Sequence, residues 1–432
     1  MDLRYFIKQL KTKKGIMEIT SKPSITYEVA HFEKRFEKKA TILMTPKECP
    51  SFKIISNIID SKKKMALALG IKEQQLYDFF SSKIRSPIPY EVRLNAQKFY
   101  ELDSLHKLPV VKHYEKDAGP YITSSLVFVK NPETGLQNMS IHRMRVLDDN
   151  KLVIRMVEGR HLHRIYSLYR EKNQCTPIAI AIGVHPAVEM AAAYQAPYNV
   201  DELEIANSLL GGKLEVFRTP LTNLNVPMAE FILEGEVSVN EIGEDKMVEI
   251  LGNYDMTRMQ PIVYIRKIMY RKNAYYRDIL PAGREHQILM SFPIEMKLNR
   301  HVKDVVPSAK RVILTNGGCN WLHAVIQITK RLEGDGKNAL IAAFAAHPSL
   351  KLAIVVDDDI DPEDPESVEY ALATRFQAGR DLIIIRRAKG SSLDPSSDQA
   401  KVLTDKLGID ATIKLGKDRE IYERAKIPLS KK

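Results

Sequence analysis

The sequence has few cysteines, and they are not close together. Cys49, Cys175 and Cys319 stand far apart among 432 residues, and no Cys-x-x-Cys pair occurs. A disulfide framework or a Cys-based zinc site needs more numerous or more closely spaced cysteines, so this usage argues against both. The scarcity fits a reducing compartment, and we expect a cytoplasmic protein.

Long apolar runs are missing as well. The most apolar stretches, Pro177–Val184 and Leu340–Ala346, are far shorter than the roughly 20 residues that cross a bilayer. The segment from Met1 to Lys14 mixes Asp, Arg and Lys with brief apolar runs, so no signal peptide is predicted. We therefore expect no membrane partner.

Several common catalytic signatures are also absent. The sequence has no GxGxxG, GxxxxGK[ST], HExxH or GxSxG pattern, so these dinucleotide, phosphate-loop, zinc-peptidase and hydrolase motifs are excluded. The segment Gly334–Lys337 has the composition of a phosphate loop without its spacing, and it predicts a turn between two helices.

Positive charge is in excess. The chain contains 65 Lys and Arg residues against 54 Asp and Glu residues, which gives a formal net charge of +11. Such a surface suits anionic partners, including nucleic acids, phosphorylated metabolites and phosphate-bearing cofactors. The charge is spread along the chain and does not choose among these classes.

The pattern of apolar residues changes twice along the chain. Residues 1–107 mix helix and strand signals, and residues 108–300 are dominated by alternating strands, as in a half-buried antiparallel sheet or barrel. Residues 301–432 alternate strands and helices, which is typical of a parallel-rich α/β domain. The sequence therefore predicts a mixed α/β protein with three domains at these boundaries.

Several expected elements can be compared with the structure. Strands are expected at Arg311–Thr315 and Lys351–Asp357, helices at Trp321–Leu332, Asn338–Ala346 and Pro365–Phe376, a loop at Asn240–Gly252 and a linker at Pro293–Val306. Asp364 is expected to cap the helix that starts at Pro365.

Three segments carry more polar side chains than a fold needs. They are Asn138–Met144, Glu158–Arg164 and Glu244–Tyr254. Asn, His and carboxylate side chains together suit Mn²⁺ or Mg²⁺ that also holds a phosphate. An Arg beside two carboxylates suits proton transfer, because the Arg keeps one carboxylate charged while the other acts as an acid. By composition alone, satisfied turn residues are the plainer interpretation of each segment.

In these segments the sequence resembles the UbiD family of reversible decarboxylases, which use prenylated FMN. The matching residues are Asn138 and Arg143 of an Asn-x-x-x-x-Arg pattern, His161, Pro197 and Glu202 of a Pro-x-x-x-x-Glu pattern, and Glu244, Glu249, Gly252 and Tyr254 downstream. The carboxy-terminal hallmark of the family is matched by Val355–Asp361 and Ala371–Arg375.

The resemblance implies a fold and a set of site residues. The fold would be an N-terminal α/β domain, a central split β-barrel that binds prenylated FMN, and a C-terminal α/β domain. Asn138, His161 and Glu202 would bind Mn²⁺ or Mg²⁺, with K⁺ as a further candidate ion. The cofactor would be bound by these three residues together with Ser140, Ile141, His142, Arg143 and Arg160. His163 and Glu204 remain alternatives to His161 and Glu202.

The resemblance also implies a catalytic set of Arg143, Glu244 and Glu249. Glu249 would donate a proton, Arg143 would bind the substrate carboxylate or orient Glu249, and Glu244 would hold Arg143. Decarboxylation leaves a carbanion that no side chain can delocalise, so an electron-sink cofactor is required.

The expected substrate is a phosphorylated unsaturated acid. Some archaeal members of the family convert trans-anhydromevalonate 5-phosphate to isopentenyl phosphate in the mevalonate pathway of isoprenoid synthesis, and residues 244–249 look like theirs. An aromatic acid, such as a 4-hydroxybenzoate derivative, is the alternative within the family. The resemblance further implies a homo-oligomer and a flavin prenyltransferase that supplies the cofactor.

A non-enzymatic RNA-binding protein is the alternative from another class. Tyr270–Arg277 interleaves basic and aromatic residues, as base-stacking platforms do. A strand and turn with half-buried tyrosines is the plainer interpretation of this segment, and we expect no nucleic-acid partner.

Overall fold

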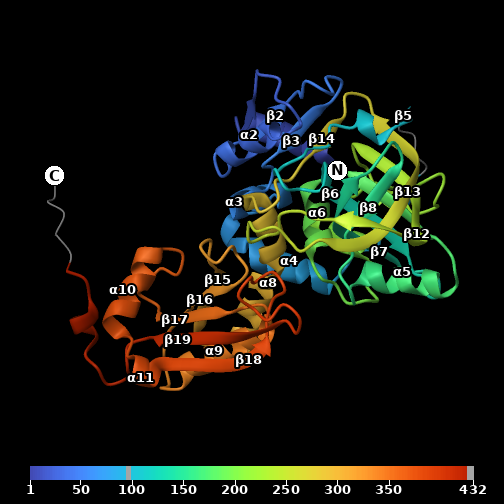
Figure 1. Cartoon of the computed structure of the whole chain (residues 1–432). Coiled ribbons are helices and arrows are strands. Elements are labelled where there is room, and N and C mark those ends of the chain that lie inside the picture. The colour runs from blue at the N-terminus through green and yellow to red at the C-terminus, as the bar shows by residue number, and fades with distance from the viewer. Residues whose placement is uncertain (94–98, 426–432) are drawn as a thin grey trace, which may run out of the picture. The chain divides into compact units, whose positions relative to one another are not determined.

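The chain divides into two compact units, Met1–Met290 and Ser291–Lys432 (Figure 1). The structure is a computed structural model, and it describes residues 1–93 and 99–425. Buried apolar residues form separate clusters in the two units, so each unit has a core of its own. This division is coarser than the three domains predicted from the sequence, and the boundaries of those domains stay a prediction.

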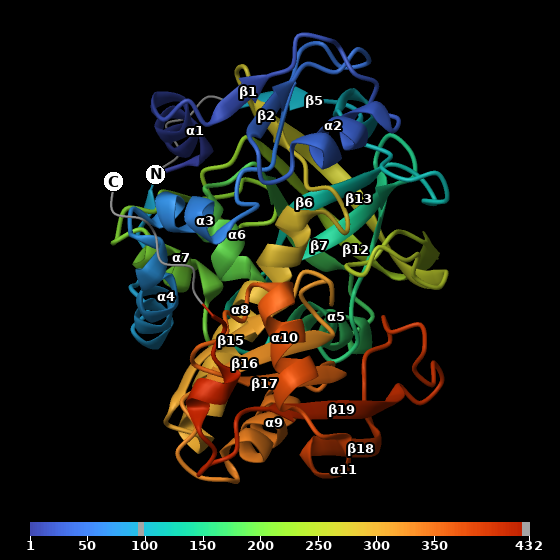
Figure 2. The same cartoon turned by 90° about the vertical axis from the view of Figure 1, so that its left-hand side faces the viewer.

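The first unit begins with a four-stranded sheet in the order β1-β2-β3-β14. Its strands are β1 (Ile16–Glu18), β2 (Thr41–Met44), β3 (Lys53–Ser56) and β14 (Tyr275–Arg277). The last strand comes from far along the chain and pairs in parallel with β3, with Tyr276 opposite Ile54. Helix α2 (Glu28–Phe36) lies beside β2 (Figures 1 and 2), and the other helices of this segment are α1 (Leu3–Thr12), α3 (Lys62–Leu69) and α4 (Leu76–Arg85).

A six-stranded antiparallel barrel follows in the first unit. Its strands run in the order β12-β9-β6-β7-β8-β13, and pairing of β12 with β13 closes the ring. Closure removes the free edges of the sheet. The strands are β6 (Tyr121–Lys130), β7 (Gln137–Val146), β8 (Lys151–Ile154), β9 (Thr176–Ile182), β12 (Phe231–Asp245) and β13 (Arg258–Arg271). The barrel predicted from strand alternation and from the family resemblance is confirmed.

Strand β7 carries the polar residues singled out in the sequence. Its two ends are buried, whereas Ser140–Arg143 in its middle are only half-buried. The neighbouring strand β6 has a register shift between Ile122 and Ser125, opposite Arg143. A bulge of this kind bends a strand and increases its local twist, which changes the direction of nearby side chains.

A close backbone approach between β12 and β13 requires glycine. A Cβ atom at Gly235 would lie 2.0 Å from the carbonyl oxygen of Tyr264. The register also shifts between Glu234 and Gly235. The two long strands can therefore cross tightly only with hydrogen at this position, and this crossing closes the barrel.

The remaining elements of the first unit are short. The helices are α5 (His161–Glu171), α6 (Pro186–Ala193) and α7 (Glu202–Leu209), with 3-10 turns at Glu73–Gln75 and Leu105–Lys107. Strand β5 (Phe99–Leu102) pairs with β13, and a small sheet joins β4 (Val92–Arg93), β10 (Val216–Arg218) and β11 (Asn225–Pro227). Helix α8 (Arg284–Val305) contains the division between the units.

The second unit is a five-stranded sheet in the order β15-β16-β17-β19-β18. Alternate residues of its strands enter two different core clusters: Ala324 and Ile326 join the cluster of α9, whereas Val325 joins that of α10. Helices therefore cover both faces of the sheet. The elements are β15 (Ala309–Leu314), β16 (His323–Ile328), β17 (Leu352–Asp357), β18 (Leu382–Lys389), β19 (Leu403–Ala411), α9 (Asp335–Ala346), α10 (Pro365–Arg375), α11 (Ala378–Asp381) and a 3-10 turn at Arg419–Tyr422.

Four expectations about local structure are wrong wholly or in part. The helix predicted at Trp321–Leu332 is strand β16, because a strand buried on both faces shows the same continuous apolar run as a buried helix. The predicted linker Pro293–Val306 lies mostly within α8, where Leu298 and Val302 are buried one helical turn apart.

The other two differences concern loops. Strand β12 continues through Asp245, so the first part of the predicted loop Asn240–Gly252 is extended. The turn at Gly334 precedes a single helix, since β16 is a strand. By contrast, Asp364 caps α10 as predicted, because its side chain accepts a hydrogen bond from the backbone N–H of Glu366.

Residues 1–93 and 99–425 include no helix with both the length and the apolarity that crossing a membrane requires.

The buried His185 predicts an acid-sensitive fold. Its side chain accepts a hydrogen bond from the N–H of Ala187 at the start of α6, and burial lowers its pKa from 6.5 to about 3. Between these values the unfolded chain binds a proton that the folded chain does not, so stability falls as pH decreases through this window. Replacement His185→Asn keeps a side chain that can cap α6. Between about pH 7 and about pH 4.5, the free energy of unfolding of this variant should fall by about 2 kcal/mol less than that of the wild type.

Denaturant unfolding of both proteins at the two pH values measures this effect. The exposed His31 offers a matched control for the loss of one imidazole, and His31→Asn should keep the free energy of unfolding at pH 7 within about 0.5 kcal/mol of the wild type. An equal loss of stability in the wild type and in His185→Asn would contradict the assignment.

Candidate active site

The three predicted metal ligands come together in the first unit. Asn138 lies on β7, His161 is the first residue of α5, and Glu202 is the first residue of α7. The Nδ2 atom of Asn138 donates to Oε1 of Glu202 at 2.9 Å and lies 3.4 Å from Nδ1 of His161. Nδ1 of His161 lies 3.7 Å from Oε1 of Glu202. Residues far apart in the sequence thus form one polar cluster.

This donor set fits a hard divalent cation. Rotation of the Asn138 amide by half a turn offers Oδ1 beside the imidazole and the carboxylate. The other oxygen of Glu202 accepts from the N–H of Met139 at 2.9 Å, which fixes the orientation of the carboxylate. Helices α5 and α7 begin at His161 and Glu202, and the positive ends of helix dipoles favour a phosphate.

The geometry favours His161 and Glu202 over the alternatives His163 and Glu204. Nδ1 of His163 accepts from the N–H of Gly159 at 3.5 Å, within its own helix-starting segment. Among the described residues, neither His163 nor Glu204 has a recorded contact with Asn138.

Ser140 and His142 continue the site along β7. Oγ of Ser140 lies 2.9 Å from Nε2 of His142, and Nδ1 of His142 lies 2.8 Å from the carbonyl oxygen of Arg155. Because a carbonyl only accepts, Nδ1 carries the proton and Nε2 accepts from the Ser140 hydroxyl. Burial lowers the pKa of His142 to about 4, so the ring is neutral near neutral pH. Ile141 is half-buried beside them, and Arg160 is the exposed N-cap of α5.

Arg143 lies at the centre of a carboxylate cluster. Its Nη2 atom is 2.5 Å from Oδ2 of Asp245 and 3.4 Å from Oδ2 of Asp255, and its Nη1 atom donates to Oε1 of Glu249. Burial alone would lower the pKa of Arg143, but the charges of Glu249 and Asp245 outweigh burial and raise it. The guanidinium therefore stays charged and can orient anionic groups.

The structure does not bring Glu244 to Arg143. Glu244 is exposed, and its carbonyl oxygen accepts from Nη1 of Arg145 at 2.7 Å. Strand β12 continues through Asp245, and successive side chains of a strand point to opposite faces. The expectation that Glu244 holds Arg143 is therefore wrong, and Asp245 occupies that position.

The two carboxylates that bind Arg143 most closely differ in exposure. The side chain of Asp245 is 0% exposed, and its Oδ1 atom accepts from the hydroxyl of Tyr121 at 3.1 Å. The side chain of Glu249 is 18% exposed. Asp245 is thus buried against the guanidinium, whereas part of the Glu249 carboxylate is accessible to a bound molecule or to solvent.

Two further arginines, Arg155 and Arg258, lie in this region, and the sequence analysis did not predict them as site residues. Nε and Nη2 of Arg258 each lie 3.0 Å from an oxygen of Asp255. Burial lowers the pKa of Arg155, and the charges of Arg258 and Arg143 lower it further. In the described part of the chain, Arg155 has no carboxylate ion pair. The N–H of Arg155 donates to the carbonyl oxygen of Arg143, so the pairing of the two segments brings these arginines together. No local pattern in the sequence indicates this pairing.

The basic and aromatic segment Tyr270–Arg277 forms the end of β13, a turn and β14. Tyr276 and Arg277 are 0% exposed. Arg277 pairs with Glu189 at 3.0 Å and with Glu285 at 2.7 Å. Tyr276 and Arg277 thus belong to the core, and Tyr270 and Tyr275 are half-buried, so the interpretation of this segment as a strand and turn is confirmed.

Comparison with known proteins defines the class. Three domain families match the chain along its length: the 3-octaprenyl-4-hydroxybenzoate carboxy-lyase N-terminal domain at residues 7–84, the Rift-related domain at 90–284 and the C-terminal domain at 287–411. Together with the barrel and the arginine–carboxylate cluster, these matches show that the chain belongs to the UbiD family of carboxy-lyases. The family predicted from the motifs is confirmed.

Individual relatives match over nearly their full length. Anhydromevalonate phosphate decarboxylase of Methanocaldococcus jannaschii is 43% identical over 415 residues, which cover 95% of this chain and 97% of the relative. The UbiD-class enzyme HmfF from Pelotomaculum thermopropionicum, solved with FMN, has a TM-score of 0.95 at 33% identity and covers 99% of this chain and 98% of its own. An evolved dimeric form of HmfF, solved with prFMN, has a TM-score of 0.90 at 31% identity and covers 99% and 97%.

Proposed function

We propose that the protein is a prenylated-FMN-dependent, non-oxidative decarboxylase that converts trans-anhydromevalonate 5-phosphate to isopentenyl phosphate. The observation that carries this proposal is that one barrel strand, β7, carries both Arg143, which pairs with Glu249, and Asn138, which contacts His161 and Glu202. The substrate is supported by the name of the Methanocaldococcus jannaschii relative, and the cofactor by the ligands of the two HmfF structures.

The cofactor would be held on one side of the barrel. Asn138, His161 and Glu202 would bind Mn²⁺ or Mg²⁺, and this ion and the two helix N-termini would bind the flavin phosphate. Ser140, Ile141, His142 and Arg160 would line the flavin, and K⁺ is a further ion of the proposal. When bound, prenylated FMN supplies the electron sink that decarboxylation requires. A flavin prenyltransferase would supply it.

The side chains around Arg143 would bind the substrate and move a proton. Arg143 would bind the substrate carboxylate while Asp245 holds the guanidinium in place. Glu249 would take up a proton and deliver it to the α carbon after CO₂ has left. A positioned acid of this kind contributes roughly a hundredfold or more to the rate.

Arg155 supports a second anionic group on the substrate. Its guanidinium lies near those of Arg143 and Arg258 and near the carboxylates of Asp255 and Glu249. In the described ranges it forms no ion pair with either carboxylate, so it is available to a ligand with negative charge. A phosphorylated acid offers such a group in addition to its carboxylate, whereas a 4-hydroxybenzoate derivative does not. The observation therefore favours the phosphorylated substrate over the aromatic one.

The flavin-loaded protein should release CO₂ from trans-anhydromevalonate 5-phosphate and form isopentenyl phosphate. The value of kcat/KM should exceed that for the unphosphorylated acid or for 4-hydroxybenzoate by about 100-fold or more, because only the first substrate offers Arg155 a phosphate in addition to the carboxylate. Product detection by mass spectrometry with the three substrates tests the assignment. Faster turnover of 4-hydroxybenzoate would contradict the proposed substrate and leave the family unaffected.

A homo-oligomer in the cytoplasm completes the proposal. The evolved dimeric form of HmfF shows that a similar fold can assemble with itself. Light scattering of the purified protein measures the assembly, and a monomer at every concentration would contradict it.

A further inference from the structure

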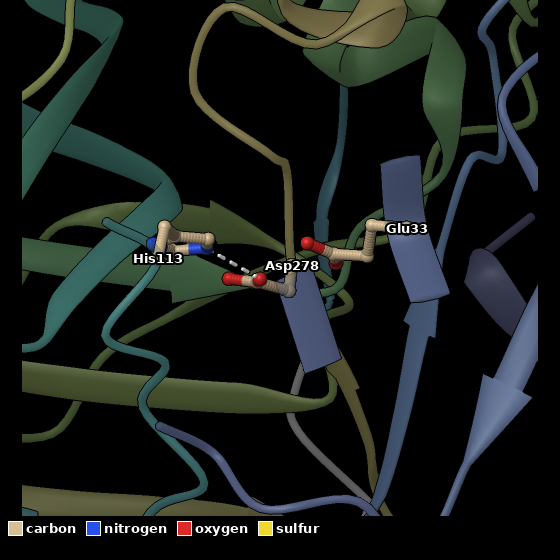
Figure 3. A group of neighbouring side chains, drawn as sticks. All are labelled: Glu33, His113 and Asp278. Atoms are coloured by element: carbon tan, nitrogen blue, oxygen red, sulfur yellow. Dashed lines mark hydrogen bonds and ion pairs between the residues drawn. The ribbon is translucent and has the colours of Figure 1, made fainter. Parts of the chain in front are cut away.

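A second group of possible metal ligands lies in the first unit, built from residues that the proposed reaction does not use. Glu33 comes from α2, His113 from the segment before β6, and Asp278 from the residue after β14. Figure 3 shows the imidazole of His113 and the carboxylate of Glu33 both pointing toward Asp278. One ligand atom from each side chain lies within 4.8 Å of the others.

All three side chains are cut off from solvent. Glu33 and Asp278 are 0% exposed, and His113 is 4% exposed. Nε2 of His113 lies 2.8 Å from Oδ2 of Asp278, and the hydroxyl of Thr123 donates to Oδ1 of Asp278 at 3.0 Å. The orientation of Asp278 is therefore fixed from two sides, as is usual for a ligating carboxylate.

Several polar atoms of this cluster have no hydrogen-bond partner. Neither carboxylate oxygen of Glu33 makes a hydrogen bond of good geometry, although Ser56 and Asp278 are its neighbours. Oγ of Ser56, which is 0% exposed, and Nδ1 of His113 are also unpartnered. Buried polar atoms are normally satisfied, and leaving them unpaired costs free energy. Such a concentration of unpartnered atoms points to a missing ligand.

The neighbouring charges do not remove this cost. Arg277 is next to Asp278 in the chain, but its guanidinium is already paired with Glu189 and Glu285. A cation between the two carboxylates would neutralise them and at the same time satisfy the open oxygens.

We propose that Glu33, His113 and Asp278 form a structural site for a divalent transition-metal ion, separate from the cluster at Asn138. Two carboxylate oxygens and one imidazole nitrogen suit Zn²⁺ or Mn²⁺, and the hydroxyl of Ser56 offers a fourth ligand. The ion would join α2, the segment before β6 and the end of β14, which are distant in the sequence. A site closed to solvent on all sides stabilises a fold and leaves no open position for a substrate.

The metal content of the flavin-loaded enzyme tests the proposal. Purified wild-type protein should retain about one more metal ion per chain than Glu33→Gln, a change that keeps the shape of the side chain and removes its charge. Glu33→Gln should keep its flavin, which separates this site from the one at Glu202. A matched Glu202→Gln variant should lose flavin and keep the ion at Glu33. Equal metal content in the wild type and in Glu33→Gln would overturn the proposal.

A measurement on the unaltered protein guards against a variant that fails to fold. Crystals of the wild type soaked with Zn²⁺ should give an anomalous scattering peak between Glu33, His113 and Asp278. Anomalous signal confined to the cluster at Asn138, or no signal at all, would overturn the proposal and leave Glu33 as a buried protonated acid beside Asp278.

Discussion

Replacement Glu249→Gln should lower kcat by at least about 100-fold, because it removes the acid that we place at the α carbon and keeps the size of the side chain. Flavin content should be unchanged, since Glu249 contacts Arg143 and takes no part in the Asn138 cluster. The rate of CO₂ release from trans-anhydromevalonate 5-phosphate measures kcat, and the visible absorption spectrum measures the flavin content.

Glu244 provides a matched control for this prediction. It lies five residues earlier, is exposed, and has its side chain away from Arg143, so Glu244→Gln should keep kcat within about twofold of the wild type. Turnover by Glu249→Gln at the wild-type rate would remove Glu249 from the mechanism. A large loss in Glu244→Gln alone would restore the role that the motif suggested and count against the observed geometry.

Replacement His161→Ala should release the metal and the flavin together. The imidazole is one of the three ligands that we propose, and loss of a ligand or its support weakens metal binding by roughly 10-fold to 100-fold or more. Without the ion, the flavin phosphate would lose its main source of positive charge apart from the helix ends. Flavin absorbance relative to protein and the metal content after gel filtration should both fall to about a tenth or less.

His163 is the control for this second prediction. It lies on the same helix two residues later and contacts the N–H of Gly159. His163→Ala should therefore keep both metal and flavin. If His163→Ala loses metal and flavin while His161→Ala keeps them, His163 is the metal ligand. The proposed phosphate site at His161 would then be wrong.

Spaced motifs carried the assignment of the family and the prediction of the metal ligands. Asn138, His161 and Glu202 could be named together because each sits in a local pattern of the family, and the structure brings all three within hydrogen-bonding range or close to it. The barrel could be predicted because strand alternation is a local signal with a period of two residues. Alternation is weaker where a strand is buried on both faces, and β16 was therefore mistaken for a helix.

The carboxylate partner of Arg143 could not be chosen from the sequence. Glu244 and Asp245 are neighbours, and which of them faces Arg143 depends on how far β12 continues past its bulges. A shift of one residue turns every side chain of a strand to the other face. The motif thus located the acidic segment, while the sheet register selected Asp245.

The sequence by itself determined the family through its spaced motifs, and much of the order of helices and strands through apolar periodicity, because both are local patterns. The residues that would hold the cofactor follow from the resemblance to the family and stay a prediction. Tertiary structure alone decided the pairing of Arg143 with Asp245, the charge of Arg155 without a carboxylate ion pair, and the meeting of Glu33 with His113 and Asp278. His113 and Asp278 are 165 residues apart and still share a hydrogen bond. Such contacts arise only when separate strands are brought into register, so no local pattern encodes them.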